Sequence, residues 1–180
     1  MTSLYELYYG KQLKVFIYNP DCKASELAKD LIISYGHEIV NQPSLAHFAI
    51  APLLTHKLTP EQFNAPRYGT LIFHPSLLPR HRGADAIKWA YKLGELYTGV
   101  TWFWCSEGYD TGDICEQEIV TLDKTLSPRE FYDSVILPAM SETLKRILEN
   151  ISFGIIRRVK QNESAATYEP KIEKLKVISG

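Results

Sequence analysis

The chain has 180 residues, of which 45% are hydrophobic and 23% are charged, and its formal net charge at pH 7 is −1. This length allows one domain with a substantial core, and the composition is that of a globular protein rather than a disordered or membrane-embedded one. Because positive and negative residues are mixed along the chain, a general electrostatic attraction to nucleic acid is not expected.

The N-terminal stretch MTSLYELYYGKQ has no basic segment followed by a long apolar run, so it does not resemble a secretory signal. No stretch approaches the roughly 20 apolar residues that span a bilayer. The three cysteines, Cys22, Cys105 and Cys115, are odd in number and lack metal-ligand spacing. We therefore predict a cytoplasmic protein with free thiols, no bound metal and no membrane partner.

The first half of the chain alternates strand-like and helical segments. Apolar, β-branched and aromatic runs predict buried strands at residues 13–18, 45–54 and 69–73. Between the first two strands, apolar residues recur at helical spacing until Gly36 ends the pattern. This alternation predicts an α/β fold with a mainly parallel sheet and helices on both faces.

The second half continues with a helix, two strands and a long helix. Residues 84–94 fit an amphipathic helix, whereas residues 99–105 and 113–122 are strand-like. The sequence SPRE, Ser127 to Glu130, is a capping box with proline at the first helical position. It opens a long helix that Pro138 should kink.

Two side chains are candidates for chemistry because each follows an apolar strand. His74 comes directly after the 69–73 strand, and Asp110 lies in the loop EGYDTGD after the next strand. In parallel α/β sheets, ligands bind at the carboxyl ends of the strands. The turn HPSLLP stiffens the backbone behind the histidine, and Gly108 and Gly112 would let the backbone approach a flat ligand closely. The alternative is a histidine that caps a strand and an aspartate that makes an Asx-turn.

Two motifs decide between these alternatives. HPSLLPRHRGADAIKWA followed by GVTWFWCSEGYDTGDI resembles the signature of the folate-dependent formyltransferase family, over residues 69–117. This family includes glycinamide ribonucleotide and methionyl-tRNA formyltransferases and the hydrolase domain of 10-formyltetrahydrofolate dehydrogenase. ATYEPKI, residues 166–172, is a weaker match to a segment that follows the domain in methionyl-tRNA formyltransferases. The resemblance implies an enzyme with a Rossmann-like formyltransferase domain that uses 10-formyltetrahydrofolate as its formyl donor.

The resemblance also assigns roles to individual residues. His74 would donate a hydrogen bond to the formyl oxygen and stabilise the oxyanion of the tetrahedral intermediate. Asp110 would tune the histidine's protonation and accept the nucleophile's proton, directly or through water. The asparagine that the family carries two residues before the histidine is replaced by Ile72, and Phe103 stands where many members have a histidine. The dehydrogenase's hydrolase domain shares this isoleucine and phenylalanine.

The resemblance places the folate on two loops. One is SEGYD; the other is LLTHKL, residues 53–58, whose residues could equally be solvated. Arg80, His81 and Arg82 could meet the glutamate tail of the folate or an acidic acceptor, or could be surface charges. The candidate folate-binding residues are His56, Lys57, Leu58, Ser106, Glu107, Gly108 and Tyr109.

The chain has 73 residues before its histidine, fewer than is usual in the family, so we predict a domain shortened at the N-terminus. No GxGxxG turn is present, which makes a phosphorylated nucleotide acceptor less expected. Residues 1–160 should form the catalytic domain and residues 161–180 a tail packed on its surface. The predicted activity is formyl transfer to an amine of unknown identity. Transfer to water or a thiol, a non-catalytic folate-binding role, and a homodimer remain open.

Overall fold

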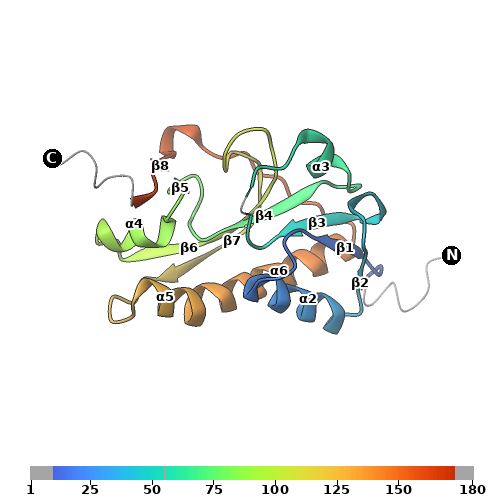
Figure 1. Cartoon of the computed structure of the whole chain (residues 1–180), viewed down its shortest axis with the longest axis horizontal. Helices are drawn as coiled ribbons and strands as arrows, with labels where there is room; N and C mark the ends of the chain where they lie inside the picture. Colours follow the sequence, from blue (N-terminus) through green and yellow to red (C-terminus); the bar gives the residue numbers. More distant parts are fainter. Residues whose placement is uncertain (1–9, 55, 173–180) are drawn as a thin grey trace.

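The structure of the protein is a computed structural model that describes residues 10–54 and 56–172. A six-stranded sheet in the order β2-β1-β3-β4-β6-β7 runs through the middle of the molecule (Figure 1). The strands from β2 to β4 are parallel, whereas β6 and β7 are each antiparallel to the preceding neighbour. The α/β class and the mainly parallel sheet are thus confirmed. The strands are β1 (Lys14–Ile17), β2 (Glu38–Ile39), β3 (Phe48–Ala51), β4 (Thr70–His74), β6 (Tyr97–Trp104) and β7 (Ile114–Thr121).

One face of the sheet is covered by the long helices. Helices α2 (Lys23–Ser34) and α6 (Leu137–Ser152) lie along this face, with α5 (Pro128–Phe131) at the end of the row (Figure 1). Alternate residues of the strands point into this layer because side chains of a strand alternate between its two faces. The resulting main core joins strand residues such as Phe48 and Trp102 to Met140 of α6.

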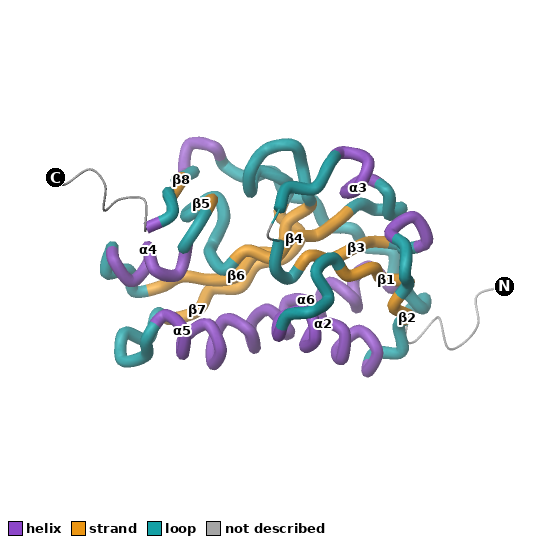
Figure 2. Tube along the Cα trace, viewed as in Figure 1, coloured by secondary structure: helices purple, strands orange, loops and turns teal. Residues whose placement is uncertain are grey.

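The opposite face is covered mainly by loops, drawn in teal in Figure 2. The short helix α3 (Pro60–Asn64) lies over this face, where the Thr70 hydroxyl donates to the Phe63 carbonyl. A two-stranded ribbon of β5 (Arg82–Gly83) and β8 (Tyr168–Glu169) also belongs to this layer. Helix α4 (Ala86–Lys92) packs at the end of the sheet, where Tyr91 meets Phe131 of α5 edge to face.

Strand β6 runs antiparallel to β4. The loop that follows β6 therefore does not start at the carboxyl end of a parallel strand, as the sequence suggested. Because β6 runs antiparallel to β4, the loop after Trp104 starts beside the beginning of β4, where the Cys105 amide donates to the Thr70 carbonyl. The loop then runs back over the face of β4 and brings Asp110 to the carboxyl end of that strand. Asp110 therefore reaches the expected edge by crossing the sheet, not by following a parallel strand.

The long helix starts at the expected capping box and continues past its proline. The Ser127 hydroxyl accepts from the Glu130 amide, and the Glu130 carboxylate accepts from the Ser127 amide. Ahead of Pro138 the helix widens into a π-helical turn, Tyr132–Ile136. Such a turn changes the hydrogen-bond pattern where the proline has no N–H and where its ring would crowd the preceding turn.

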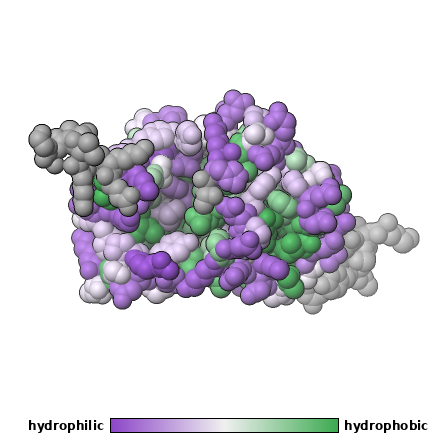
Figure 3. Space-filling view, in the orientation of Figure 1, coloured by the Kyte–Doolittle hydropathy of each residue, from purple (hydrophilic) through white to green (hydrophobic). Residues whose placement is uncertain are grey.

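Residues 161–172 cross the loop-covered face and pair with it. Besides the β5–β8 pairing, the Trp89 indole donates to the Pro170 carbonyl, and Gln161 is buried. The last residues of the predicted tail, 173–180, lie outside the described part. The face of the molecule seen in Figure 3 is mainly hydrophilic with separate hydrophobic areas. None of the helices in the described residues is long and apolar enough to cross a membrane.

Candidate active site

His74 is the last residue of β4 and is almost fully buried, at 7% exposure. Its Nε2 lies 2.6 Å from the carbonyl oxygen of His81, at the far end of the HPSLLPRH turn. A carbonyl oxygen can only accept, so Nε2 carries the proton of this hydrogen bond. Nδ1 is left to face the space above the strand. The turn itself contains a cis peptide bond between Leu78 and Pro79.

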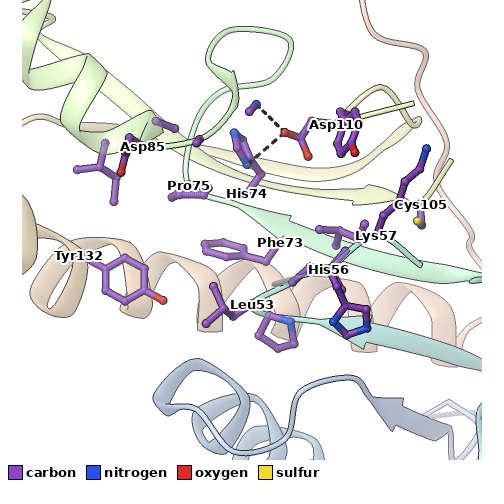
Figure 4. A pocket seen from close by; sticks show the side chains of 18 of the residues that line it. Leu53, His56, Lys57, Phe73, His74, Pro75, Asp85, Cys105, Asp110 and Tyr132 are labelled. Carbon is purple, nitrogen blue, oxygen red and sulfur yellow. Dashed lines mark hydrogen bonds and ion pairs between the residues drawn. The ribbon is translucent and has the colours of Figure 1, made fainter. Parts of the chain in front are cut away.

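Asp110 approaches His74 from the loop after β6 (Figure 4). Its Oδ2 lies 3.9 Å from His74 Nδ1 and accepts a hydrogen bond of 2.7 Å from the Gly83 amide. The 3.9 Å separation is an ion-pair distance, too long for a hydrogen bond. His74 Nδ1 is therefore close to a carboxylate without being hydrogen-bonded to it, and it can donate to another acceptor when the ring carries a second proton. The structure thus brings together the two residues that the sequence singled out.

The backbone of Asp110 is in the left-handed region, with φ 54°, which aspartate tolerates better than most residues. The glycines on either side serve the packing of this loop. A Cβ at Gly112 would lie 1.6 Å from the Trp104 carbonyl oxygen, and one at Gly108 would lie 2.2 Å from Thr111 Oγ1. The sequence interpretation that these glycines make room for a flat ligand is therefore incomplete, because their close contacts are with the loop and the strand end.

A cavity of about 950 Å³ opens beside His74 and Asp110. This volume lies within the range of small-molecule sites. The lining includes apolar residues from the loop after β3, such as Pro52 and Leu53, and Tyr132 from the π-helical turn. His74, Asp110 and Asp85 are polar groups in the same lining.

Six of the seven residues predicted to bind folate line this cavity: His56, Lys57, Leu58, Ser106, Gly108 and Tyr109. Glu107 is exposed and is not part of the lining. Lys57 and Tyr109 connect the two predicted loops, since the Lys57 ammonium lies 5.1 Å from the centre of the Tyr109 ring. Thr55, within the first loop, lies outside the described residues. The two loops are thus neighbours across the cavity, although almost fifty residues separate them in the sequence.

Ile72 and Phe103, the two departures from the family pattern, are buried on the same face as His74. They form a small apolar cluster with Ala51 and Leu78, separate from the main core. Ile72 also lines the cavity two residues before His74. The isoleucine therefore both packs against its neighbours and presents an apolar surface where the family carries an amide.

Two of the three basic residues of PRHRG differ from what their sequence pattern indicated. Arg80 is an exposed charge that pairs with Glu95, as one of the two alternatives predicted, whereas His81 and Arg82 are buried to 1% exposure. The Arg82 guanidinium donates to both oxygens of Glu163 and to Gln161 Oε1. His81 and Arg82 are neither surface charges nor lining residues of the cavity. They hold the turn to residues 161–172.

Gln161 is a site residue that sequence reasoning missed. Its Nε2 donates to the carbonyls of Asp110 and Gly112, at 2.8 Å each, while its Oε1 accepts from Arg82. These bonds fix the backbone on both sides of the Asp110 carboxylate. A glutamine in a polar tail carries no local signal of such a role, because its partners lie about fifty and eighty residues earlier in the chain.

Two further groups in the cavity have altered acidity. Burial raises the pKa of the Cys105 thiol to about 11, with Lys57 opposing the shift and Asp110 adding to it. Burial acts to raise the pKa of Asp85, but donation from the Ile172 amide and from Lys88 outweighs it and lowers the pKa. Among the described residues, no group of three or more His, Cys, Asp or Glu side chains is arranged to hold a metal ion.

Comparison with known proteins identifies the family. Residues 38–146 match the model of a family described as formyl transferase. The chain belongs to the formyl transferase family. The matched part of this formyl transferase chain runs from β2 into α6 and includes His74, Asp110 and most of the cavity lining.

Curated relatives of this formyl transferase chain are enzymes. Cytosolic 10-formyltetrahydrofolate dehydrogenase of Mus musculus is 39% identical over 126 residues, 69% of this chain and 14% of that protein. Methionyl-tRNA formyltransferase of Lachnospira eligens is 40% identical over 111 residues, 62% of this chain and 35% of that protein. The chain spans about a seventh of the length of the dehydrogenase. The predicted family resemblance is confirmed.

Solved structures share the fold. A variant of HypX from Aquifex aeolicus is 25% identical, with a TM-score of 0.79, and the match covers 92% of this chain and 31% of HypX. The formyltransferase PseJ from Anoxybacillus kamchatkensis, solved with a formamido sugar nucleotide and tetrahydrofolate, is 21% identical with a TM-score of 0.75. That match covers 91% of this chain and 88% of PseJ. The predicted formyltransferase-type α/β fold is therefore confirmed.

Proposed function

We propose that this protein takes the formyl group of 10-formyltetrahydrofolate and transfers it to an amine through a tetrahedral intermediate. The observation that carries the proposal is the convergence of His74 Nδ1 and Asp110 Oδ2, 3.9 Å apart, at the cavity. The proposal assigns catalysis to groups within residues 1–160, with the segment that follows as their support. The folate is a substrate in this proposal, bound on the side of the cavity that Lys57 and Tyr109 line.

The chemistry follows from what the two groups can donate and accept. The acceptor nitrogen attacks the formyl carbon, a new C–N bond forms, and the formyl oxygen gains the electron pair of its double bond. When this intermediate collapses, the bond between the formyl carbon and N10 breaks and its electron pair returns to N10. The proton lost by the acceptor goes to Asp110, directly or through water, and N10 takes up a proton to give tetrahydrofolate.

His74 is suited to the negative oxygen of the intermediate. Its Nε2 is already committed to the His81 carbonyl at 2.6 Å, so only Nδ1 is available to the substrate. A ring protonated on both nitrogens donates from Nδ1 to the oxyanion, and the nearby Asp110 carboxylate stabilises the positive ring. Burial of His74 strengthens this interaction, since less water screens it.

The absence of the family asparagine has a direct chemical meaning. Ile72 has no hydrogen-bond donor, so His74 is the side chain at this end of β4 that can stabilise the oxyanion. The environment that Ile72 and Phe103 create is apolar. A low local dielectric strengthens each remaining electrostatic interaction with the oxyanion. We therefore assign His74 a larger share of the catalysis than it would have beside an amide.

Transfer to water or a thiol is the second candidate. It is favoured by Ile72 and Phe103, because the hydrolase domain of 10-formyltetrahydrofolate dehydrogenase carries the same two residue types at these positions. The 39% identity to a dehydrogenase of that name also favours it. With water as the nucleophile the same steps release formate. With a thiol they give a thioester.

The test is a product assay on the purified full chain. It is incubated with 10-formyltetrahydrofolate alone, with a panel of amines that includes amino sugars, and with small thiols, and tetrahydrofolate is quantified by chromatography. Release that requires an amine supports the leading proposal. Release without any added acceptor, or release that requires a thiol, supports the second candidate. Folate binding with no release under any condition would favour a non-catalytic relative.

Matched variants connect the activity to the site. We expect His74→Ala to lower turnover by about 10²–10³-fold, the usual effect of removing an oxyanion donor. Asp110→Asn should keep the shape of the side chain but lose its charge and basicity, with a loss of about 10²–10⁴-fold. Asp123→Asn, the same change in an exposed loop outside the cavity lining, serves as the control. Turnover that survives His74→Ala unchanged would contradict the proposal.

A further inference from the structure

His81 is a buried histidine whose imidazole lies between two carboxylates. Nδ1 is 3.1 Å from Glu169 Oε1, and Nε2 is 3.1 Å from Glu95 Oε1. The His81 side chain is 2% exposed. Arg80 also binds Glu95, through the same Oε1 atom. Because both ring nitrogens face oxygens of carboxylates, both can donate only when the ring carries two protons.

The main chain of His81 is as firmly held as its side chain. Its amide donates to Thr167 Oγ1 at 2.8 Å, and its φ is 57°, in the left-handed region that non-glycine residues avoid. Such a conformation persists only when the surroundings fix it. Here the surroundings are Glu95, which follows α4, and Glu169 of β8. The consequence is a carbonyl aimed at His74.

That carbonyl determines which nitrogen of His74 faces the substrate. It accepts from His74 Nε2 at 2.6 Å and so holds the proton there and turns Nδ1 toward Asp110 and the cavity. Were the carbonyl to swing away, the His74 ring would lose its only described hydrogen bond and could rotate or exchange tautomers. The side chain of His81 does not line the cavity. Its influence on the reaction must therefore pass through its main chain.

We propose that His81 is a positioning residue for formyl transfer, held between Glu95 and Glu169 so that its carbonyl fixes the direction and tautomer of His74. The inference rests on the proposed function. It gives residues 161–172 a part in catalysis, because Glu169 and Thr167 both belong to that segment and both bind His81. It also gives a reason for the burial of His81 in this turn.

The experiment removes the carboxylates and leaves His81 and His74 in place. Glu95→Gln and Glu169→Gln, singly and together, keep the size of the side chains but remove their charge. Glu118→Gln on β7 is the matched control, since it breaks an ion pair of 2.8 Å with Arg146 away from the cavity. Two readouts are taken on the full chain: kcat and KM for 10-formyltetrahydrofolate, and the tautomer of His74 from nitrogen-15 NMR of labelled protein.

We expect the double variant to lose about 10- to 100-fold in kcat, the cost of a small misplacement of a catalytic group, while KM changes far less. In the double variant the His74 spectrum should lose the signature of a proton held on Nε2. The control should change neither. A folded double variant with kcat within twofold of the parent, or with an unchanged His74 tautomer, would overturn the proposal. Should the double variant not fold, the two single variants supply the same comparison.

The two readouts separate this inference from the proposed function. If the parent protein turns over no formyl donor under any condition, the proposed function fails. The NMR comparison then still decides whether Glu95 and Glu169 control the His74 tautomer through His81. If the parent is active and the tautomer is insensitive to both substitutions, only the positioning role fails.

Discussion

Ile72 on β4 and Phe103 on β6 are direct cross-strand partners. Both point to the face that carries His74 and pack in one small apolar cluster. They are also the two positions at which the chain departs from the pattern of many family members, which carry asparagine and histidine there. Because the two side chains are neighbours, we infer that the departures form one coupled change, an apolar pair in place of a polar pair.

This coupling can be measured with a double-mutant cycle. Ile72→Asn alone should lower the free energy of unfolding by about 1–3 kcal/mol, because it buries an amide beside Phe103 with no partner. Phe103→His should cost about 3 kcal/mol or more through lost packing and an unpaired ring. In the double variant the amide and the imidazole can bind each other, so its loss should fall short of the sum by about 1 kcal/mol. Urea unfolding at neutral pH provides the measurement.

A second cycle, between Ile72 and a residue of the main core, serves as the control. Val15 of β1 is fully buried in the main core, away from the Ile72 cluster. Val15→Ala combined with Ile72→Asn should give additive losses within about 0.5 kcal/mol. If Ile72→Asn and Phe103→His are equally additive, the two positions are independent and the inferred coupling is wrong.

Gln161 offers a test of how firmly the Asp110 loop must be held. Gln161→Glu keeps an oxygen for Arg82 but replaces the amide donor that binds the Asp110 and Gly112 carbonyls. We expect the free energy of unfolding to fall by about 1–3 kcal/mol, since buried carbonyls lose their donor. Turnover should fall by about 10-fold or more, because the carboxylate of Asp110 shifts from its place. Urea unfolding and the tetrahydrofolate assay measure the two effects.

The neighbouring residue supplies the control. Asn162 Oδ1 accepts from Ser164, so Asn162→Asp preserves the acceptor at an exposed position of the same segment. Its effect on stability should stay within about 0.5 kcal/mol. Loss of activity in Asn162→Asp equal to that in Gln161→Glu would mean that any change in this segment disturbs the enzyme, and that Gln161 has no special role.

The buried strands could be predicted because their pattern is local. The run at residues 13–18 is mainly apolar and β4 is buried on both faces, as expected of strands covered by helices on one side and by loops on the other. His74 at the end of β4 and the capping box at Ser127 follow from short stretches in the same way. For such features, the neighbouring residues alone fix the physical environment.

The features that sequence reasoning missed depend on partners far away in the chain. The antiparallel direction of β6 is set by its pairing with β4 and β7, not by its own residues. His81 and Arg82 resemble surface charges in sequence, yet they are buried because Glu169 and Glu163, more than eighty residues later, pair with them. Buried charges need such partners, and no residue near PRHRG in the sequence indicates them.

Asp85 should make the stability of the chain depend on acid pH. Its Oδ2 accepts from the Ile172 amide, and its Oδ1 lies 3.0 Å from Lys88 Nζ. Against the opposing effect of burial, these contacts lower its pKa below the ordinary 3.8. A lowered pKa in the folded state means a contribution to stability that is present above the unfolded value and lost as the pH falls through the folded value.

We therefore expect Asp85→Asn to be less stable than the parent at pH 6, with the difference shrinking as the pH falls below 3.8 toward the lowered pKa. Urea unfolding at a series of pH values measures this difference. Lys88→Met should show a smaller difference of the same sign, because the Ile172 amide still binds the carboxylate. A difference between Asp85→Asn and the parent that does not change with pH would contradict the assignment.

Cys105 lines the cavity, so the reactivity of its thiol measures how enclosed the cavity is. Thiolates, not thiols, react with iodoacetamide, and burial raises the Cys105 pKa to about 11. Alkylation at this position, followed by mass spectrometry, should be slow at pH 7.5 and should rise about tenfold per pH unit until the pH nears 11. Addition of 5-formyltetrahydrofolate should slow it further, since Cys105 lines the proposed folate site. Alkylation at pH 7.5 as fast as in urea-unfolded protein, or no protection by the folate, would show that Cys105 is not enclosed as described.

The raised pKa of Cys105 also means that the parent should lose stability relative to Cys105→Ser as the pH rises above 9 toward 11.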